Sequence, residues 1–509
     1  LPEPPRTPLN ADVTGEWSGC GCTCHKVAFE SVPGFYVSGN LFLPDSAGRA
    51  DSIPGILCPH GHWLQGRLHD DSMSCSVPVR CMMLARTLGA AVFAYDMVGY
   101  GDACQLEHLG AFSDLLWGIS NMGIQTWNSI RALDFLLSIP GVDPKRLCMT
   151  GASGGATQTL AMMAVDDRLA AAAPVCMISY EMQGGCVCEN APLLRLDATN
   201  VDIARCFAPK PLFVGSTSGD WTGTTPRKEF PAIRDIYHLY GAEAQLSGHH
   251  TNALHNYGRE MREAVYSFFR QTLLQQRHTA PATEYGNLEK PPLRDLMVWW
   301  GRTAPEALTN ATVVNIWRDA RQTALAPILK EPGETSIRLG SLLEHVLGLG
   351  CCGDLHPSVL DQPAVSVSRD SGCFRIHAVR KTLAQTNSEH FYTYNLGLTQ
   401  TCVQDILRAV GHGGATSCPV RLVADKETAL PALLAAAVSQ DIATVEADLA
   451  AVRADTDGAL ADCCDVPALN QIGGLATVFS CLVGREMILS NVHPSVQKLF
   501  EKYAPPDKP

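Results

Sequence analysis

Short apolar segments that alternate with helical segments constrain the fold of this chain more than any other feature. Apolar runs at residues 53–58, 90–96 and 146–151 are typical of buried strands, and segments 80–88 and 125–139 between them have helical periodicity. Strands joined by helices of this length lie parallel in one sheet, with right-handed crossovers. The sequence therefore predicts an α/β fold with a mostly parallel sheet and helices on both of its faces.

The alternation divides the 509 residues into unequal parts. It begins near residue 27 and continues to about residue 275, where a polar, proline-containing stretch follows. We expect an N-terminal arm or hairpin at 1–26, a first α/β domain at 27–275, a linker at 276–293 and a second domain at 294–509. Domains of about 100–200 residues are common, so the length agrees with this division.

The second domain repeats part of the first. A helix at 406–410, a strand that begins at 420, a sharp turn and an alanine-rich helix at 430–437 follow the order of elements around residues 129–153. We interpret the second domain as a degenerate copy of the first. A chance likeness between two common helix–strand units is the alternative.

The composition excludes several classes of partner. Lys and Arg number 39 against 51 Asp and Glu, a net charge of −12, so we expect no basic surface for nucleic acid or an anionic membrane. No run of about 18 apolar residues is present, so we expect no transmembrane helix. The chain begins at Leu1 without a signal-peptide pattern, so we expect any targeting segment to lie outside this sequence.

The 20 cysteines do not indicate a disulfide framework, because this chain is much longer than the small secreted domains that depend on one. Cys58, Cys148 and Cys176 stand within apolar runs, where cysteine behaves as a small apolar residue. The cluster from Cys20 to His25, C-x-C-x-C-H, lacks the two-residue gap of a zinc knuckle. We expect a hairpin there, mostly free thiols, and no metal or cofactor.

A catalytic motif stands at the end of one predicted strand. Residues 151–155 read Gly-Ala-Ser-Gly-Gly, the G-x-S-x-G pattern, between a strand and a helix. Small flanking residues allow a sharp turn, which places Ser153 above the sheet as a nucleophile and directs the N–H of Gly154 at an oxyanion. A plain glycine-rich turn is the alternative.

A serine nucleophile needs a base, and the base needs an orienting carboxylate. In the chain order of α/β-hydrolases, the acid and then the histidine follow the serine. Asp220 follows the predicted strand at 211–215, and we assign it the role of the acid. His255 directly precedes the last helix of the first domain and is our candidate base, with His250 as the second candidate.

The loop after the first of the buried strands is expected to complete an oxyanion hole. It reads His60-Gly61-His62-Trp63, and esterases use a loop at this place to supply a backbone N–H. The expected donor is the N–H of His62 or of Trp63, and the two histidine side chains are expected to shape the loop. Asp96 ends the next strand, and we interpret it as a structural hydrogen-bonding residue.

Together these motifs resemble those of the acetyl-xylan-esterase-like α/β-hydrolases, a group related to dienelactone hydrolases. The resemblance covers residues 27–274 and rests on five segments: 60–63 (HGHW), 151–155 (GASGG), 184–190 (GGCVCEN), 219–222 (GDWT) and 255–257 (HNY). It implies an α/β-hydrolase fold, a triad of Ser153, Asp220 and His255, and a loop at 186–190 beside the pocket. Further substrate contacts are expected from four residues: His60, Glu189, Trp221 and His250.

The resemblance implies a serine carboxylic-ester hydrolase that forms an acyl-enzyme and deacetylates carbohydrate or related small-molecule esters. A serine peptidase of the prolyl-oligopeptidase type shares the fold and the triad, but there is no room for its propeller before residue 27. A non-catalytic binding or scaffold protein is the third alternative.

Long members of this family carry a C-terminal α/β domain. In the second half of this chain, Lys426 stands where the serine would be, so we predict a non-catalytic pseudo-hydrolase domain that covers the first site, positions a polymer or holds a second subunit. The compartment stays open, because the resemblance favours a periplasmic or secreted enzyme whereas free thiols favour the cytoplasm.

Overall fold

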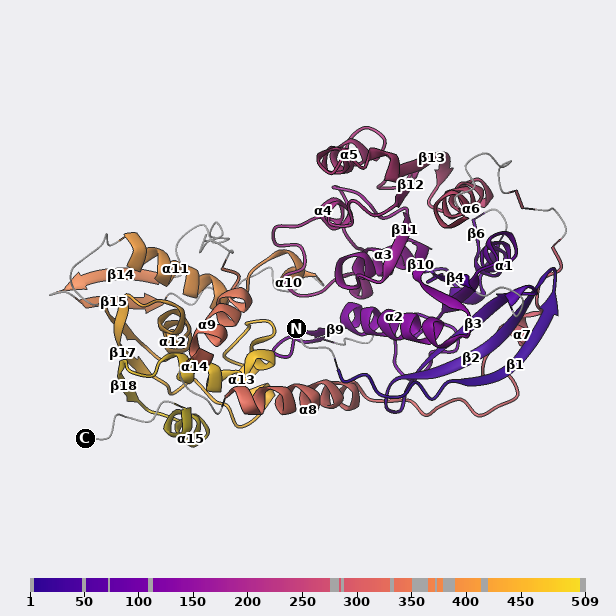
Figure 1. The fold of residues 1–509 in the computed structure, drawn as a ribbon. Helices are drawn as coiled ribbons and strands as arrows, with labels where there is room; N and C mark the ends of the chain where they lie inside the picture. The colour runs from indigo at the N-terminus through magenta and orange to yellow at the C-terminus, as the bar shows by residue number, and fades with distance from the viewer. Residues whose placement is uncertain are drawn as a thin grey trace.

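The computed structural model places the chain in two lobes, each built on its own sheet (Figure 1). It describes residues 4–47, 52–71, 74–108, 113–274, 283–284, 288–329, 334–349, 365–370, 373–378, 390–412 and 420–503. Within these ranges no helix is long and apolar enough to cross a bilayer.

The first lobe contains a nine-stranded sheet with the order β1-β2-β3-β7-β4-β10-β11-β12-β13. Neighbouring strands from β1 to β7 are antiparallel, and those from β7 to β13 are parallel. In that order the strands span Asp12–Gly19, Cys22–Val32, Phe35–Pro44, Ala91–Tyr95, Ile53–Leu57, Val142–Ala152, Leu169–Val175, Leu212–Gly219 and Leu246–Leu254. The exchange of β7 and β4, followed by four parallel strands in chain order, is the strand order of the α/β-hydrolase fold, and it confirms the fold predicted for this half.

Helices cover both faces of this sheet because its strands alternate apolar side chains between them. Phe93 of β7 packs with α2 and α3, whereas its neighbour Val92 packs with α1 and α6 on the opposite face. One face carries α2 (Asn121–Ser138), α3 (Gly154–Val165), α4 (Asn200–Arg205) and α5 (Glu229–Leu239); the other carries α1 (Val77–Leu88) and α6 (Arg259–Leu274). Short pairs β5 (Asp70–Asp71) with β6 (Cys75–Ser76) and β8 (Ser113–Asp114) with β9 (Ile119–Ser120) lie in the connections.

The N-terminal cysteine cluster forms the expected hairpin. Strands β1 and β2 meet at a turn where Cys20 and Gly21 both have positive φ, 50° and 82°. Cys22 and Cys24 lie on one side of β2 and are buried in the core, while His25 faces the other way and lies 3.5 Å from Glu16. The hairpin is the edge of the main sheet.

The predicted linker returns to the first lobe. Within 276–293 the structure describes residues 283–284 and 288–293, and Glu284 binds the buried Arg262 of α6 through both carboxylate oxygens, at 2.6 and 2.7 Å. Helix α7 (Leu293–Leu296) then places Leu296 in the same core as α1 and α6. The rest of this segment lies outside the described residues.

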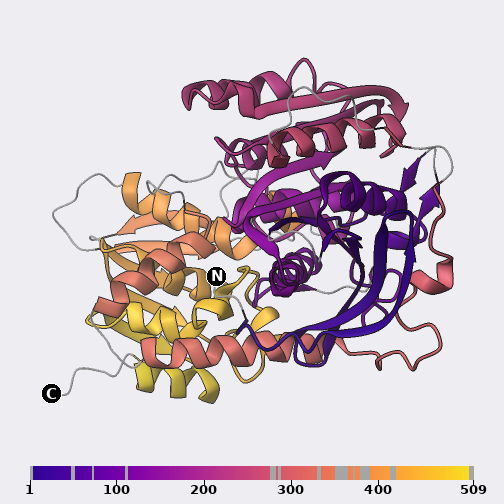
Figure 2. The ribbon, with the colours of Figure 1, turned by 45° about the vertical axis from the view of Figure 1, so that its right-hand side comes forward.

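The second lobe lies beside the first (Figure 2). It contains a five-stranded sheet, β14-β15-β16-β17-β18, in chain order. Its strands span Val365–Asp370, Cys373–Ala378, Val420–Ala424, Ile442–Asp448 and Glu486–Ser490, and all but the β14–β15 pair are parallel. Its helices are α9 (Glu334–Val346), α10 (Phe391–Tyr394), α11 (Leu398–His412), α12 (Ala429–Val438), α13 (Asp457–Ala461), α14 (Leu475–Cys481) and α15 (Pro494–Tyr503). The parallel strands β16, β17 and β18 follow one another as β10, β11 and β12 do in the first lobe. That the second lobe is a degenerate copy of the first stays a prediction.

Two loops of the first lobe and one long helix join the lobes. The backbone of residues 115–116 accepts hydrogen bonds from Ala468 and Asn470, and Leu116 is buried in the core of the second lobe. Residues 193 and 195 donate backbone hydrogen bonds to residues 392 and 393. Helix α8 (Asn310–Ile328) runs along both lobes, with Val313 in the core of the first (Figures 1 and 2).

Candidate active site

The predicted nucleophile lies on a strained turn between β10 and α3. Ser153 has φ 57° and ψ −125°, a backbone conformation that residues other than glycine rarely adopt. Its N–H donates to the carbonyl oxygen of Val175 in the next strand at 3.1 Å. The turn fits only because its neighbours lack side chains. A methyl group added at Gly151 or Gly155 would lie 2.8 or 2.6 Å from the carbonyl oxygen of Pro59. This is the geometry of a nucleophile elbow.

The loop after β4 lies directly against this turn. A methyl group added at Gly61 would lie 3.0 Å from Cβ of Ser153, so only glycine allows this approach. The N–H of Trp63 already donates to Gly61 O at 2.8 Å. Of the two oxyanion donors expected from this loop, only the N–H of His62 is left without a backbone partner among the residues that the structure describes. The N–H of Gly154 lies in the first turn of α3, where helical N–H groups have no internal acceptor.

The expected acid and base lie at the ends of the next two parallel strands. Nδ1 of His255 donates to Oδ2 of Asp220 at 2.7 Å, and the carboxylate is only 2% exposed. Burial alone would raise the pKa of Asp220, but hydrogen bonds from His255 and Thr222 lower it to about 2. Asp220 is therefore ionised at neutral pH and fixes the proton of His255 on Nδ1, which leaves Nε2 to accept a proton.

Two indole rings lie close to the ring of His255. Its ring centroid lies 4.4 Å from that of Trp221 and 5.9 Å from that of Trp63. Nε1 of Trp63 would in turn lie 3.3 Å from a methyl group at Gly61, which itself approaches Ser153. Among the described residues, no hydrogen bond joins the hydroxyl of Ser153 to His255.

The second candidate base has a different partner. Nδ1 of His250 contacts Oγ of Ser216 at 2.8 Å, and His249 contacts Glu260 at 2.9 Å. Both histidines belong to β13, which pairs in register with β12 and continues to Leu254. The acid contacts His255 alone among these three histidines, which favours His255 as the base.

Two of the expected substrate contacts are occupied by the protein itself. His60 is 1% exposed; its Nδ1 donates to Gly61 O at 2.7 Å and its Nε2 accepts from Met97 N–H at 3.0 Å. Burial lowers the pKa of His60 to about 3, so the ring is neutral. Glu189 is 3% exposed and accepts from the N–H groups of Gly185 and Cys186 at 2.8 and 3.1 Å. Both side chains therefore hold loops in place, through both ring nitrogens of His60 and through Oε2 of Glu189.

Asp96 is structural, as expected. Its carboxylate is fully buried, accepts from Ser38 Oγ at 2.8 Å and pairs with Nε of Arg67 at 2.9 Å. Arg67 also pairs with Asp102, so one buried cation lies between two buried carboxylates. Burial raises the pKa of Asp96 to about 6 despite this pairing.

Two groupings of side chains among the described residues were not predicted. Cys176, at the end of β11, has φ 57° and lies with Asp220 and His255 in one group whose polar atoms are all within 4.8 Å of one another. A second group of this kind contains His62, His108, Cys186 and Cys188. No local signal joins these four residues, because they come from three separate loops; the C-x-C pair in the loop expected beside the pocket was the one available hint.

The strand order defines the first lobe as an α/β-hydrolase fold, and the strained turn at Ser153 and the Asp220–His255 pair lie at one edge of its sheet. No model of a protein family matches the sequence, and no curated protein does either.

Solved structures give partial matches. A methylesterase is 33% identical over 52% of this chain and 58% of its own length, with a TM-score of 0.47. A glucuronoyl esterase from Solibacter usitatus is 14% identical over 53% of this chain and 88% of its own, with a TM-score of 0.40. An acetyl xylan esterase from Paenibacillus sp. R4 is 17% identical over 52% of this chain and 90% of its own, with a TM-score of 0.38. All three are named as esterases, and each match covers about half of this chain.

Proposed function

We propose that the first lobe hydrolyses carboxylic esters through an acyl-serine intermediate. The observation that carries this proposal is the 2.7 Å hydrogen bond from His255 to the ionised Asp220, at the same edge of the sheet as the strained turn of Ser153. An oriented imidazole is what a serine hydroxyl needs in order to attack a carbonyl.

The reaction then follows in two halves. The hydroxyl oxygen of Ser153 attacks the ester carbonyl while Nε2 of His255 takes its proton, and the N–H groups of Gly154 and His62 bind the oxyanion. The tetrahedral intermediate expels the alcohol, which receives the proton from His255. Water attacks the acyl-serine with His255 again as base, and the acid is released as Ser153 regains its proton. Asp220 stabilises the imidazolium in both halves.

The substrate class that we propose is a carbohydrate-linked ester with a small acyl or alkyl part. The motifs resemble those of acetyl-xylan-esterase-like enzymes, and the partly matching structures are named as methyl, acetyl xylan and glucuronoyl esterases. Trp221 lies beside His255, and among the described residues its buried Nε1 has no hydrogen-bond partner, so it is the substrate contact that we propose first.

The second lobe is proposed to be non-catalytic. At the turn between β16 and α12, Asp425 accepts from the N–H groups of Glu427 and Thr428 at 3.1 Å, an ordinary capped turn. Lys426 has no positive φ, unlike Ser153. A turn of this kind does not raise a nucleophile above the sheet.

An ester panel tests the proposal. Acetylated xylo-oligosaccharides, methyl uronates and aryl acetates are assayed with the wild type and with Ser153→Ala, His255→Ala and His249→Ala. We expect turnover of an acetyl or methyl ester that is lost in the first two variants and kept in the third, which removes a half-buried histidine of β13. Peptide hydrolysis without ester hydrolysis, or equal turnover by Ser153→Ala, would contradict it.

A further inference from the structure

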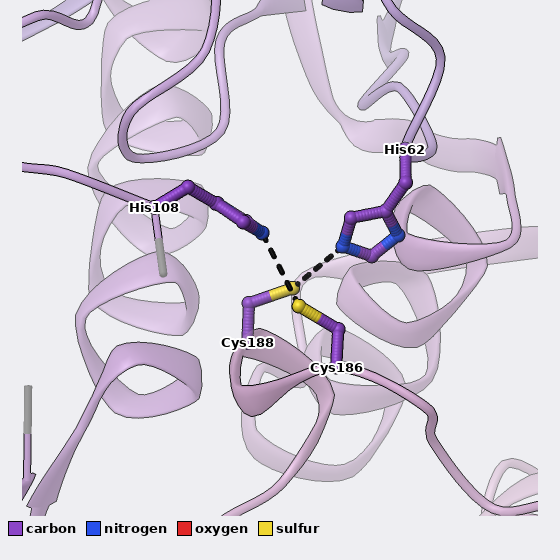
Figure 3. Close-up of side chains that lie close together, drawn as sticks. All are labelled: His62, His108, Cys186 and Cys188. Carbon is purple, nitrogen blue, oxygen red and sulfur yellow. Dashed lines mark hydrogen bonds between the residues drawn. The ribbon is translucent and has the colours of Figure 1, made fainter. Parts of the chain in front are cut away.

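Two histidines and two cysteines converge on one point beside the candidate active site (Figure 3). Nε2 of His62 lies 3.1 Å from Sγ of Cys188, and Nε2 of His108 lies 3.3 Å from Sγ of Cys186. All four ligand atoms lie within 4.8 Å of one another. The residues come from the loop after β4, the loop after β7 and the turn at η3 (Val187–Glu189), so the fold itself brings them together.

We propose that His62, His108, Cys186 and Cys188 bind one zinc ion. A tetrahedral zinc ion with bonds of about 2.1 Å to nitrogen and about 2.3 Å to sulfur separates a nitrogen from a sulfur by about 3.6 Å. The two nitrogen–sulfur distances of 3.1 and 3.3 Å are shorter than that value by about 0.5 and about 0.3 Å. A donor set of two thiolates and two imidazoles binds zinc in preference to magnesium, calcium or manganese.

The surroundings already orient these ligands. Nδ1 of His108 donates to the carbonyl oxygen of Val98 at 2.6 Å, which leaves the lone pair of its Nε2 directed at the sulfurs. Glu189 fixes the turn that carries both cysteines, because its Oε2 accepts from the N–H of Cys186. Its Oε1 lies 3.8 Å from Nδ1 of His62, on the side of the ring opposite Cys188. An outer hydrogen bond such as that of His108 to Val98 holds a metal-binding histidine in position.

Four protein ligands leave no open position, so the ion has a structural role. The ring of His62 lies against the nucleophile turn: a methyl group added at Gly154 would be 2.7 Å from Cε1 of His62. An ion on this ring fixes the loop whose N–H we assign to the oxyanion hole. That consequence rests on the proposed function, whereas zinc binding does not.

The metal content of the whole protein, purified under reducing conditions, tests the proposal. Elemental analysis is expected to find one zinc per chain in the wild type and in Ser153→Ala, and at least tenfold less in Cys188→Ser and His108→Ala. Cys206→Ser, which removes an exposed cysteine, is the matched control and keeps the ion. Replacement of zinc by Co²⁺ is expected to give thiolate-to-cobalt charge transfer and tetrahedral d–d bands.

A measurement on the wild type avoids variants that fail to fold. Alkylation followed by peptide mass spectrometry is expected to show Cys186 and Cys188 protected until a chelator is added, while Cys206 reacts throughout. A wild type that takes up no Zn²⁺, full zinc content in Cys188→Ser, a different ion at the site, or a Cys186–Cys188 disulfide under these conditions would overturn the proposal. The Ser153→Ala variant is expected to lose ester turnover and to keep its zinc. The zinc measurement therefore stays valid even if the esterase proposal fails.

Discussion

Replacement of Asp220 by Asn tests the acid assignment. The amide keeps the shape of the carboxylate but removes the negative charge, and its NH₂ group can bind Nδ1 of His255, which leaves the proton on Nε2. A base protonated on Nε2 cannot accept the proton of Ser153. In a serine protease triad the same change lowers kcat by about 10⁴, or about 5.4 kcal/mol of transition-state stabilisation. We expect a loss of 10³- to 10⁴-fold here.

The expected cost to stability is smaller. The pKa of Asp220 falls from 3.8 to about 2, and at 1.36 kcal/mol per pKa unit this difference corresponds to about 2 kcal/mol. Because the pKa is lower in the folded state, this stability is present above about pH 4 and is lost as the pH falls toward 2. The variant should therefore stay folded at pH 7, with a Tm only a few degrees lower.

The assay measures kcat/KM on an aryl acetate at pH 7 together with thermal unfolding by circular dichroism. Asp143→Asn is the control, because Asp143 also has a lowered pKa, caused first by the Lys145 N–H and then by Arg146, but it lies on the surface away from the site. Asp143→Asn is expected to keep full turnover. If Asp220→Asn turns over within tenfold of the wild type while folded, the acid is a different residue.

Two further predictions concern stability and the second lobe. Arg67→Met leaves the buried carboxylates of Asp96 and Asp102 without their cation, so we expect the free energy of unfolding in urea to fall by about 3–5 kcal/mol. Arg234→Met, at an exposed arginine, should change the free energy of unfolding by less than about 0.5 kcal/mol. Equal effects of the two substitutions would contradict the stabilising role of the buried ion pairs. Lys426→Ala should leave ester turnover unchanged, and a folded variant without activity would refute the non-catalytic assignment.

Short sequence motifs predicted those parts of the candidate site that depend on a few neighbouring residues. The strand, turn and helix around Ser153 follow from small residues between apolar segments, and the positions of Asp220 and His255 follow from the ends of later strands. The ends of parallel strands lie at one edge of a sheet. Residues that follow such strands are therefore brought to the same edge by the strand order alone.

What the sequence did not predict depends on hydrogen bonds within loops and on contacts between distant parts of the chain. The N–H of Trp63 is consumed by a turn within its own loop, and both nitrogens of His60 are used by neighbouring backbone. The group of His62, His108 and the two cysteines at 186 and 188 spans 127 positions without the short spacing that marks a zinc site in sequence, so only the folded chain brings it together.

Covalent trapping of the nucleophile tests the central claim most directly. The wild-type protein is treated with a fluorophosphonate, digested and analysed by peptide mass spectrometry. A single adduct on Ser153, absent in Ser153→Ala and strongly reduced in His255→Ala, is the predicted result. Absence of an adduct on the folded wild type, or an adduct on a different residue, would contradict the assignment of Ser153 as the nucleophile of a serine hydrolase.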